Sequence, residues 1–89
     1  MEEEHGYILC YDIEFDDLRE GLSDYLIRHG WQRIQYSVFQ KTTTDEEVTT
    51  LRGFLTEQDV FSSRDDVRIF HFVGHYPVTE KKRIRFFKD

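Results

Sequence analysis

The chain has 89 residues, enough for one small hydrophobic core and too few for two, so residues 1–89 are predicted to form a single domain. A content of 16% aromatic residues excludes a disordered chain, and 34% charged residues exclude a membrane-embedded one. The formal net charge of −6 argues against a protein that coats nucleic acid indiscriminately.

The first predicted elements are a strand and a helix. Residues 7–13 are apolar on both alternating faces almost to their end, which is typical of a central strand covered on both sides. Asp16 or Asp17 can then cap a helix, and Gly30 suits the left-handed residue that ends it. Gly21 inside this helix costs about 1 kcal/mol relative to alanine. Its apolar positions recur at helical spacing: Leu18, Leu22, Tyr25 and Leu26.

The middle of the chain alternates again between apolar and polar residues. Residues 31–41 are predicted to form one long strand, or two strands joined by a bulge. Thr44 with Glu47 three residues later matches a capping box, and this opens a second helix that we expect to fray near Phe61. The apolar stripe of this helix consists of Val48, Leu51, Phe54 and Leu55.

The last third of the chain supplies further strands. A polar loop at residues 62–66 precedes a strand at 67–73, and a turn leads to a last strand at about 82–87. The resulting order, β-α-β-β-α-β plus an extra C-terminal strand, predicts a ferredoxin-like α+β sandwich whose core covers about residues 6–74. Both helices would lie on one face of the sheet. The other face is then available for homodimerisation, which would stabilise so small a domain.

No targeting or membrane segment is expected. No apolar run approaches the roughly 20 residues that span a bilayer, and the acidic residues 2–4 are unlike the start of a signal peptide. We therefore expect a cytoplasmic protein with no membrane partner. The single cysteine, Cys10, excludes an internal disulfide and is expected to be a small buried apolar side chain.

Asp12 stands out because it ends an apolar strand. A second copy that packs sheet to sheet would bring each Asp12 towards its twin, and two close carboxylates favour a hard cation such as Mg²⁺ or Mn²⁺ between them. Such an ion lowers the pKa of bound water and polarises a phosphoryl oxygen, as phosphodiester hydrolysis requires. The alternative is an aspartate that merely caps a turn or helix.

The charges are unevenly distributed along the chain. Residues 12–24 contain six acidic residues against Arg19 alone, whereas residues 67–88 contain six cations and one acid. This arrangement predicts a basic surface beside an acidic one, or simply ordinary solvated faces. The six cations are Arg68, Lys81, Lys82, Arg83, Arg85 and Lys88.

Three segments carry a resemblance to a known family. They are YILCYDI at 7–13, DDLR at 16–19 and, above all, RIQYSVF at 33–39. Together, in a chain of this length, they resemble the Cas-two family, one of the two core proteins of CRISPR adaptation. The resemblance implies a ferredoxin-like homodimer in which Asp12 from each subunit binds a shared Mg²⁺. It also implies that some members of the family cleave single-stranded RNA or double-stranded DNA.

The same resemblance suggests supporting residues. By this comparison four residues match positions that support activity or contact nucleic acid in nuclease-active members. They are Tyr11, Arg19, Arg33 and Phe39. The arginines suit phosphate because their guanidinium groups can donate two parallel hydrogen bonds. Tyr11 and Phe39 can also be plain core residues, and Arg19 can pair with an acidic neighbour on the helix. Gly21 stands where the family often has a second basic residue.

The resemblance also implies a role without catalysis. Family members act as a dimeric bridge between two dimers of the integrase Cas-one, with protospacer DNA lying across the assembly. The basic residues suited to that role are Lys81, Lys82, Arg83 and Arg85. The alternative is an edge strand protected by its charge. An RNA-cleaving toxin of related fold matches the segments less well.

The four histidines do not predict a zinc site. His71 and His75 are four apart in a strand and turn, where such residues lie about 13 Å from each other. His5 is expected in a loose terminus, and His29 ends a helix, where a cation complements the dipole. All are expected to be structural.

Overall fold

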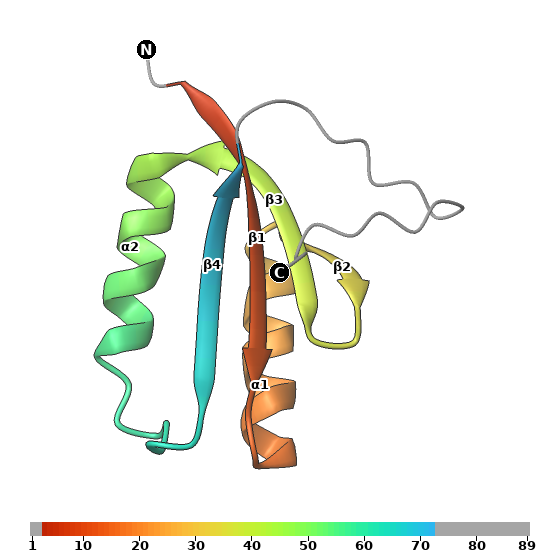
Figure 1. Ribbon diagram of the computed structural model, residues 1–89, viewed down its shortest axis with the longest axis vertical. Helices are drawn as coiled ribbons and strands as arrows, with labels where there is room; N and C mark the ends of the chain where they lie inside the picture. The colour runs from red at the N-terminus through yellow and green to blue at the C-terminus, as the bar shows by residue number, and fades with distance from the viewer. Residues whose placement is uncertain (1–2, 73–89) are drawn as a thin grey trace.

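The computed structural model describes residues 3–72, and its elements follow the predicted order. They are β1 (Glu4–Asp12), α1 (Asp16–Arg28), β2 (Gln32–Gln35), β3 (Val38–Thr44), α2 (Asp45–Thr56) and β4 (Asp66–Phe72). The β-α-β-β-α-β order is confirmed (Figure 1). The strand expected at 82–87 lies outside the described residues.

The four strands form one antiparallel sheet in the order β2-β3-β1-β4. This strand order and the two crossovers define the predicted ferredoxin-like α+β fold. β1 is central, because it pairs with β3 on one side and with β4 on the other. Its last residue, Asp12, therefore lies at the end of the sheet where β4 begins (Figure 1).

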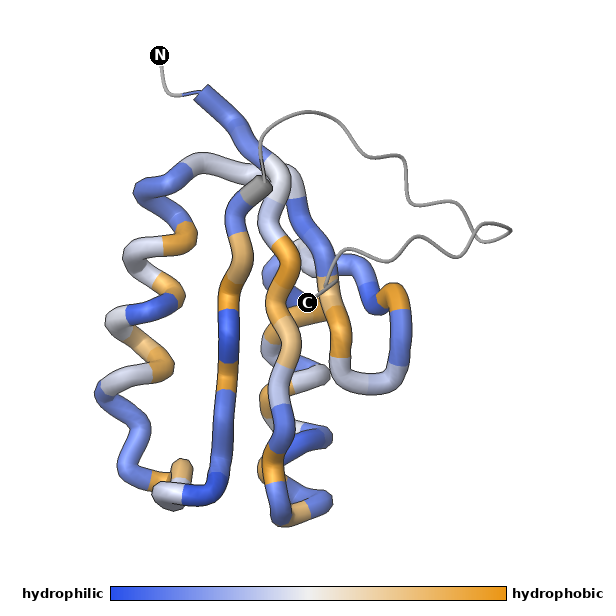
Figure 2. The backbone as a smooth tube through the Cα atoms, in the orientation of Figure 1, coloured by the Kyte–Doolittle hydropathy of each residue, from blue (hydrophilic) through white to orange (hydrophobic). Residues whose placement is uncertain are grey.

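The core lies between the sheet and the two helices. Figure 2 shows that the middle of β1 is hydrophobic and its ends are hydrophilic. Tyr7, Leu9 and Tyr11 of β1 belong to the core cluster, so the even-numbered residues of this strand point to the face that the helices leave open. The buried cluster consists of Tyr7, Leu9, Tyr11, Ile13, Leu22, Leu26, Trp31, Phe39, Val48 and Leu51.

Helix α1 begins without a side-chain cap and is followed by a left-handed glycine. Phe15, not an aspartate, is its N-cap residue and makes no side-chain cap hydrogen bond, so the predicted cap is wrong. Asp16 and Asp17 lie instead in the first turn, where their charges complement the helix dipole. Gly30 adopts φ +90° just after the helix, as predicted.

Residues 31–41 contain two strands, as the second of the two predicted alternatives had it, but a hairpin turn and not a bulge joins them. β2 and β3 are antiparallel, Tyr36 and Ser37 form the turn between them, and the register shifts between Arg33 and Gln35. The alternation of apolar residues continues through this turn, and the turn contains neither glycine nor proline. The sequence therefore carried no signal for a reversal here.

Helix α2 starts at the predicted capping residue. Oγ1 of Thr44 accepts a hydrogen bond of 3.1 Å from the backbone N–H of Glu47. The helix ends at Thr56, five residues before the expected Phe61. Across residues 3–72, neither helix is long and apolar enough to cross a bilayer.

Candidate metal and nucleic-acid site

Asp12 is an exposed carboxylate at the end of the central strand. Its neighbours Tyr11 and Ile13 are buried in the core, so the alternation of β1 directs Asp12 to the helix-free face. Within the described part of the chain, its carboxylate has no hydrogen bond or ion pair. A residue that caps a turn would have one, so the capping alternative is not what the structure contains.

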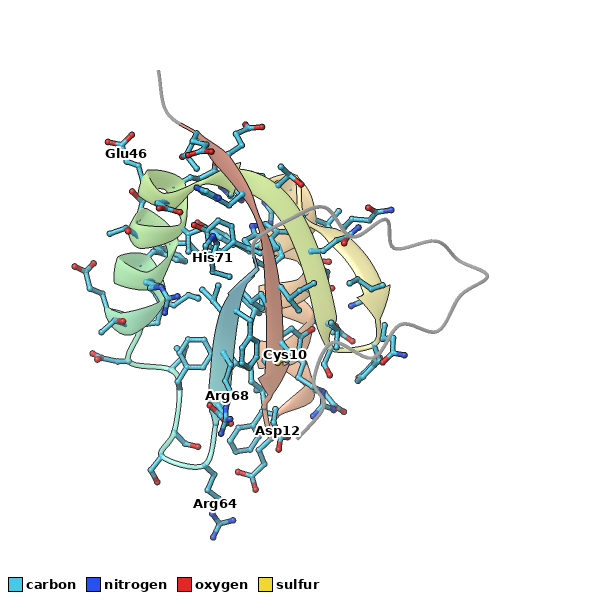
Figure 3. The ribbon with its side chains drawn as sticks, turned by 45° about the horizontal axis from the view of Figure 1, so that its top comes forward. Cys10, Asp12, Glu46, Arg64, Arg68 and His71 are labelled. Carbon is cyan, nitrogen blue, oxygen red and sulfur yellow. The ribbon has the colours of Figure 1, made fainter. Side chains whose placement is uncertain are left out.

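A second carboxylate lies beside Asp12. In the antiparallel pairing of β1 with β4, Asp66 is the direct partner of Asp12. Directly opposite residues have Cα atoms about 4.5 to 5.5 Å apart. Arg68, two residues further along β4, places its Nε 2.8 Å from Oδ2 of Asp66. Figure 3 shows Cys10, Arg68 and Asp12 at the same end of the sheet.

The loops at this end are tied together by Asp65. Its Oδ1 accepts a hydrogen bond of 3.0 Å from the backbone N–H of Glu14, and its Oδ2 accepts one of 2.9 Å from that of Ser62. The hydrogen bond from Ser62, followed by that from Glu14, holds the pKa of this carboxyl below its usual range. Asp65 thus joins the segment after β1 to the segment before β4, next to the carboxylate pair.

Cys10 lies on the same face, opposite Arg68 in the register. It is half-buried and not fully buried as the sequence suggested. Burial raises the pKa of its thiol, Arg68 opposes that shift and Asp66 adds to it. The thiol at ordinary pH is therefore protonated, and it packs as a small apolar group.

Tyr11 and Phe39 are both core residues. Phe39 is fully buried and Tyr11 nearly so, and their rings stack with centroids 6.1 Å apart. Neither ring faces solvent, so neither can stack on a base without unfolding of the core. Their contribution to the site is to hold the end of β1, and with it Asp12, against the helices.

Arg19 is directed towards the backbone and not outward to solvent. Its Nη1 donates to the carbonyl of Ile13 at 2.6 Å and to that of Glu14 at 3.1 Å, and Nη2 pairs with Asp16. Its Nε is buried without a partner among the described residues. Arg19 thus closes the loop that follows Asp12, and few of its donors remain for phosphate.

Arg33 is likewise occupied by its own domain. Its Nη2 donates to Oγ of Ser23 at 2.5 Å, and its guanidinium lies 5.1 Å from the centre of the Phe39 ring. These contacts bind β2 to α1, about as far from Asp12 as the sheet allows in strand order. Arg33 therefore does not join Asp12, whereas Arg19 lies at the loop after Asp12 with its Nη atoms bound to that loop and to an acidic neighbour on the helix.

Two other arginines lie at the Asp12 end of the sheet. The side chain of Arg68 is 66% exposed, and that of Arg64, whose Nη1 is 3.5 Å from Oε2 of Glu14, is 79% exposed. Both guanidinium groups are accessible from solution, and each also has an acidic neighbour, Asp66 for Arg68 and Glu14 for Arg64. Arg68 belongs to the basic segment 67–88, but only the pairing of β1 with β4 places it and Arg64 near Asp12. The basic residues Lys81, Lys82, Arg83 and Arg85 lie outside the described residues.

The fold and this site together define a class: a ferredoxin-like α+β domain with an exposed carboxylate at the end of its central strand. A family model described as CRISPR associated protein Cas2 matches residues 5–83. A protein of Synechocystis sp. named CRISPR-associated endoribonuclease Cas2 3 is 34% identical over 70 residues, 78% of this chain and 73% of its own. The chain belongs to the Cas2 family of CRISPR-associated proteins.

Two solved structures are similar to the chain. A hypothetical protein, TT1823, from Thermus thermophilus has a TM-score of 0.70 at 27% identity, over 86% of this chain and 92% of its own. A crystal structure titled cas2 has a TM-score of 0.62 at 19% identity, over 96% of this chain and 99% of its own. The second likeness concerns the fold alone.

Proposed function

We propose that this protein is a metal-dependent endonuclease that hydrolyses phosphodiester bonds in single-stranded RNA, double-stranded DNA or both. The observation that carries the proposal is the exposed Asp12 carboxylate at the strand end, on the helix-free face and unpaired within residues 3–72. The Synechocystis relative is named an endoribonuclease, which supports the same activity here. Membership of the Cas2 family makes an RNA-cleaving toxin the weaker alternative.

The donor set fits a hard cation. Carboxylate oxygens are what Mg²⁺ and Mn²⁺ prefer, and Asp12 and Asp66 are directly opposite each other. Asp12 would hold the ion, since Asp66 is already paired with Arg68. Bound there, the ion would lower the pKa of a water molecule and polarise a phosphoryl oxygen.

A homodimer would complete the site. The helix-free face carries Asp12 together with apolar side chains such as Phe70, which is 38% exposed. A two-fold axis through this face would place the two copies of Asp12 near one another, because such an interface uses the same patch twice. Asp12 of each copy would then share one Mg²⁺ or Mn²⁺.

The substrate phosphates need cations near that ion. Arg68 and Arg64 are exposed at the same end of the sheet, and their planar guanidinium groups can bind phosphate oxygens in pairs. We therefore assign phosphate contact to them in preference to Arg19 and Arg33. The latter two hold the loop after β1 and the β2–α1 packing.

We infer a second role from the resemblance to this family. The dimer would also be a component of the spacer-integration complex in the cytoplasm, where it would bridge two dimers of the integrase Cas-one along protospacer DNA. This role requires shape and basic surface and no chemistry, so a catalytically silent scaffold remains the alternative function. Lys81, Lys82, Arg83 and Arg85 would supply the basic surface.

The test compares wild type with Asp12→Ala in two assays. The first measures cleavage of single-stranded RNA and double-stranded DNA with Mg²⁺ or Mn²⁺, and the second measures spacer acquisition with the cognate integrase. We expect the variant to lose cleavage by at least about 100-fold, while a matched Asp24→Ala variant on the surface of α1 keeps it. Cleavage that survives in Asp12→Ala would overturn the site. Cleavage lost with acquisition intact would make the scaffold the biological role.

A further inference from the structure

Two histidines and an aspartate come together at the other end of the sheet from Asp12. The possible ligand atoms of His5, Asp45 and His71 all lie within 4.8 Å of one another. His5 is half-buried, and the other two are exposed. Figure 3 shows His71 on the side of α2, away from Asp12 and Arg68.

The strand register explains how residues so far apart in the sequence meet. His71 on β4 is the direct partner of Tyr7 on β1, so His5 and His71 are diagonal neighbours on one face. Thr43 on β3 is the direct partner of His5 and is buried on that same face. Asp45 follows two residues later as the first residue of α2. The prediction of a loose terminus for His5 is wrong, because His5 lies within β1.

The surroundings orient these three side chains. The Tyr7 hydroxyl donates to Oδ1 of Asp45, and the Tyr7 ring packs against His71 with centroids 5.2 Å apart. The rings of His5 and His71 meet edge to face at 4.8 Å. Glu3 adds a carboxylate 3.9 Å from Nε2 of His5. A buried tyrosine whose hydroxyl binds a ligand carboxylate is typical of the outer sphere of metal sites.

We propose that His5, Asp45 and His71 form a binding site for a divalent transition-metal ion of the Zn²⁺ type. Two imidazoles and one carboxylate are a ligand set that such ions take in proteins, and Mg²⁺ does not favour imidazole. Tetrahedral coordination at about 2.0 to 2.1 Å needs donor atoms about 3.4 Å apart. Small side-chain rotations close the present spread of 4.8 Å to that value, because two of the three side chains are exposed.

The ion at this site would link three elements that are separate in the sequence. His5 belongs to β1, His71 to β4 and Asp45 to α2, so binding is possible only when the sheet and helix are assembled. The ion therefore stabilises the folded protein. The site is independent of the proposed nuclease centre, since seven residues of β1, about 23 Å, separate His5 from Asp12 and their side chains occupy opposite faces.

The experiment uses full-length, tag-free protein freed of metal with a chelator. Isothermal titration with ZnCl₂ is expected to give one site per chain. At free Zn²⁺ about 100-fold above its Kd, the midpoint of thermal unfolding should rise by roughly 10 °C. His5→Gln, His71→Gln and Asp45→Asn should each weaken binding at least about tenfold. The matched controls Glu46→Gln, in the same helix turn, and His29→Gln, at the end of α1, should bind as wild type does.

Long-range ¹H–¹⁵N NMR of the imidazoles provides a readout that does not depend on stability. Zn²⁺ should shift the ring nitrogens of His5 and His71 and leave those of His29 unchanged. Asp12→Ala should bind Zn²⁺ normally. The proposal is overturned if wild type does not bind Zn²⁺, if His71→Gln binds it as tightly as wild type, or if Asp12→Ala abolishes binding.

Discussion

Asp12 at the end of β1 lies directly opposite Asp66 at the start of β4. Like charges that face each other on one side of a sheet repel and destabilise the pair. Arg68 neutralises part of this repulsion, because its Nε binds Oδ2 of Asp66, but Asp12 has no such partner within residues 3–72. Asp12 therefore carries a negative charge that is repelled by its neighbour and is not neutralised. A bound cation would relieve this repulsion.

This relationship predicts that Asp12→Asn makes the metal-free protein more stable. Removal of one charge relieves the repulsion with Asp66, so the unfolding midpoint should rise by about 2 to 4 °C in chelator. Added Mg²⁺ should raise the midpoint of wild type and leave that of the variant unchanged. Calorimetry with and without Mg²⁺ measures both effects. A lower midpoint for Asp12→Asn would show that the aspartate supports the fold, and Asp24→Asn on α1 is the control.

Arg68 should contribute to nucleic-acid binding and little to stability. Its side chain is 66% exposed, and an exposed ion pair such as that with Asp66 adds at most about 1 kcal/mol. The binding constant for single-stranded RNA decreases as the salt concentration rises, and a plot of their logarithms has a negative slope. If Arg68→Ala loses one phosphate contact, this slope should become less steep by about 0.7. Fluorescence anisotropy at several salt concentrations gives this slope. An unchanged slope would remove Arg68 from the phosphate site.

Much of the fold could be predicted from local sequence. The N-cap Thr44, the left-handed Gly30 and the apolar run of β1 are short-range signals, and the structure contains all three. Within residues 3–72 the other half of the capping box is absent, because the Glu47 carboxylate accepts from Lys41 and Thr43 instead. The β2–β3 hairpin was not foreseen as a hairpin because Tyr36 and Ser37 turn without glycine or proline. The cap of α1 was misplaced because Asp16 and Asp17 are equally suited to the first turn of a helix.

The surroundings of the candidate site were only half predictable, for a different reason. Asp12 was identified from its break in an apolar strand and from resemblance. Asp66 and Arg68 became its neighbours only through the pairing of β1 with β4, more than 50 residues apart. The meeting of His5 with His71 depends on that same pairing. Local periodicity identifies strands, but it does not say which residues of distant strands face each other.

Arg33 should prove to be a packing residue. Arg33→Ala removes the donor to Oγ of Ser23, a residue only 6% exposed, and the contact with the Phe39 ring. We expect a loss of about 1 to 2 kcal/mol in the free energy of unfolding. Arg28→Ala, an exposed arginine of α1, should change it by less than about 0.5 kcal/mol. Urea denaturation measures both.

A double-mutant cycle with Ser23→Ala separates the two roles of Arg33. If the hydrogen bond accounts for the loss, the effects of Arg33→Ala and Ser23→Ala should be strongly non-additive. If the effects are additive, and if Arg33→Ala folds stably but binds RNA more weakly, then Arg33 contacts nucleic acid and is not mainly a packing residue.

Two glycines should respond to alanine with opposite signs. Gly30 has φ +90°, and a Cβ there would lie 3.3 Å from Cε and Nζ of Lys41, so Gly30→Ala should destabilise by about 1 to 2 kcal/mol. Gly21 lies inside α1 with nothing within 4 Å of an added Cβ, so Gly21→Ala should stabilise by about 0.5 to 1 kcal/mol. Thermal unfolding of both variants tests the pair. If both substitutions stabilised the protein, or both destabilised it, the backbone conformation would not explain their effects.

Glu47 should make stability depend on pH at the junction of α1, β3 and α2. Lys41 donates to the carbonyl of His29 at 2.6 Å and also pairs with Glu47, whose other oxygen accepts from Thr43. The hydrogen bond from Lys41, then that from Thr43, lowers the pKa of Glu47. A lowered folded-state pKa means that this stabilisation is fully present above the unfolded value of 4.5 and is lost as the pH falls through the folded value.

Glu47→Gln should therefore be less stable than wild type at pH 7 and equal to it at acidic pH, once Glu47 of wild type is protonated in both the folded and the unfolded state. Because the Glu47 side chain is 49% exposed, solvent screens the pair, and the difference at pH 7 should stay below about 1 kcal/mol. It should shrink further in 1 M salt, where charges are screened within about 3 Å. Calorimetry across pH provides the curve, and Glu46→Gln in the same turn controls for the helix dipole. A difference that persists unchanged at low pH and high salt would mean that Glu47 acts by packing and not by charge.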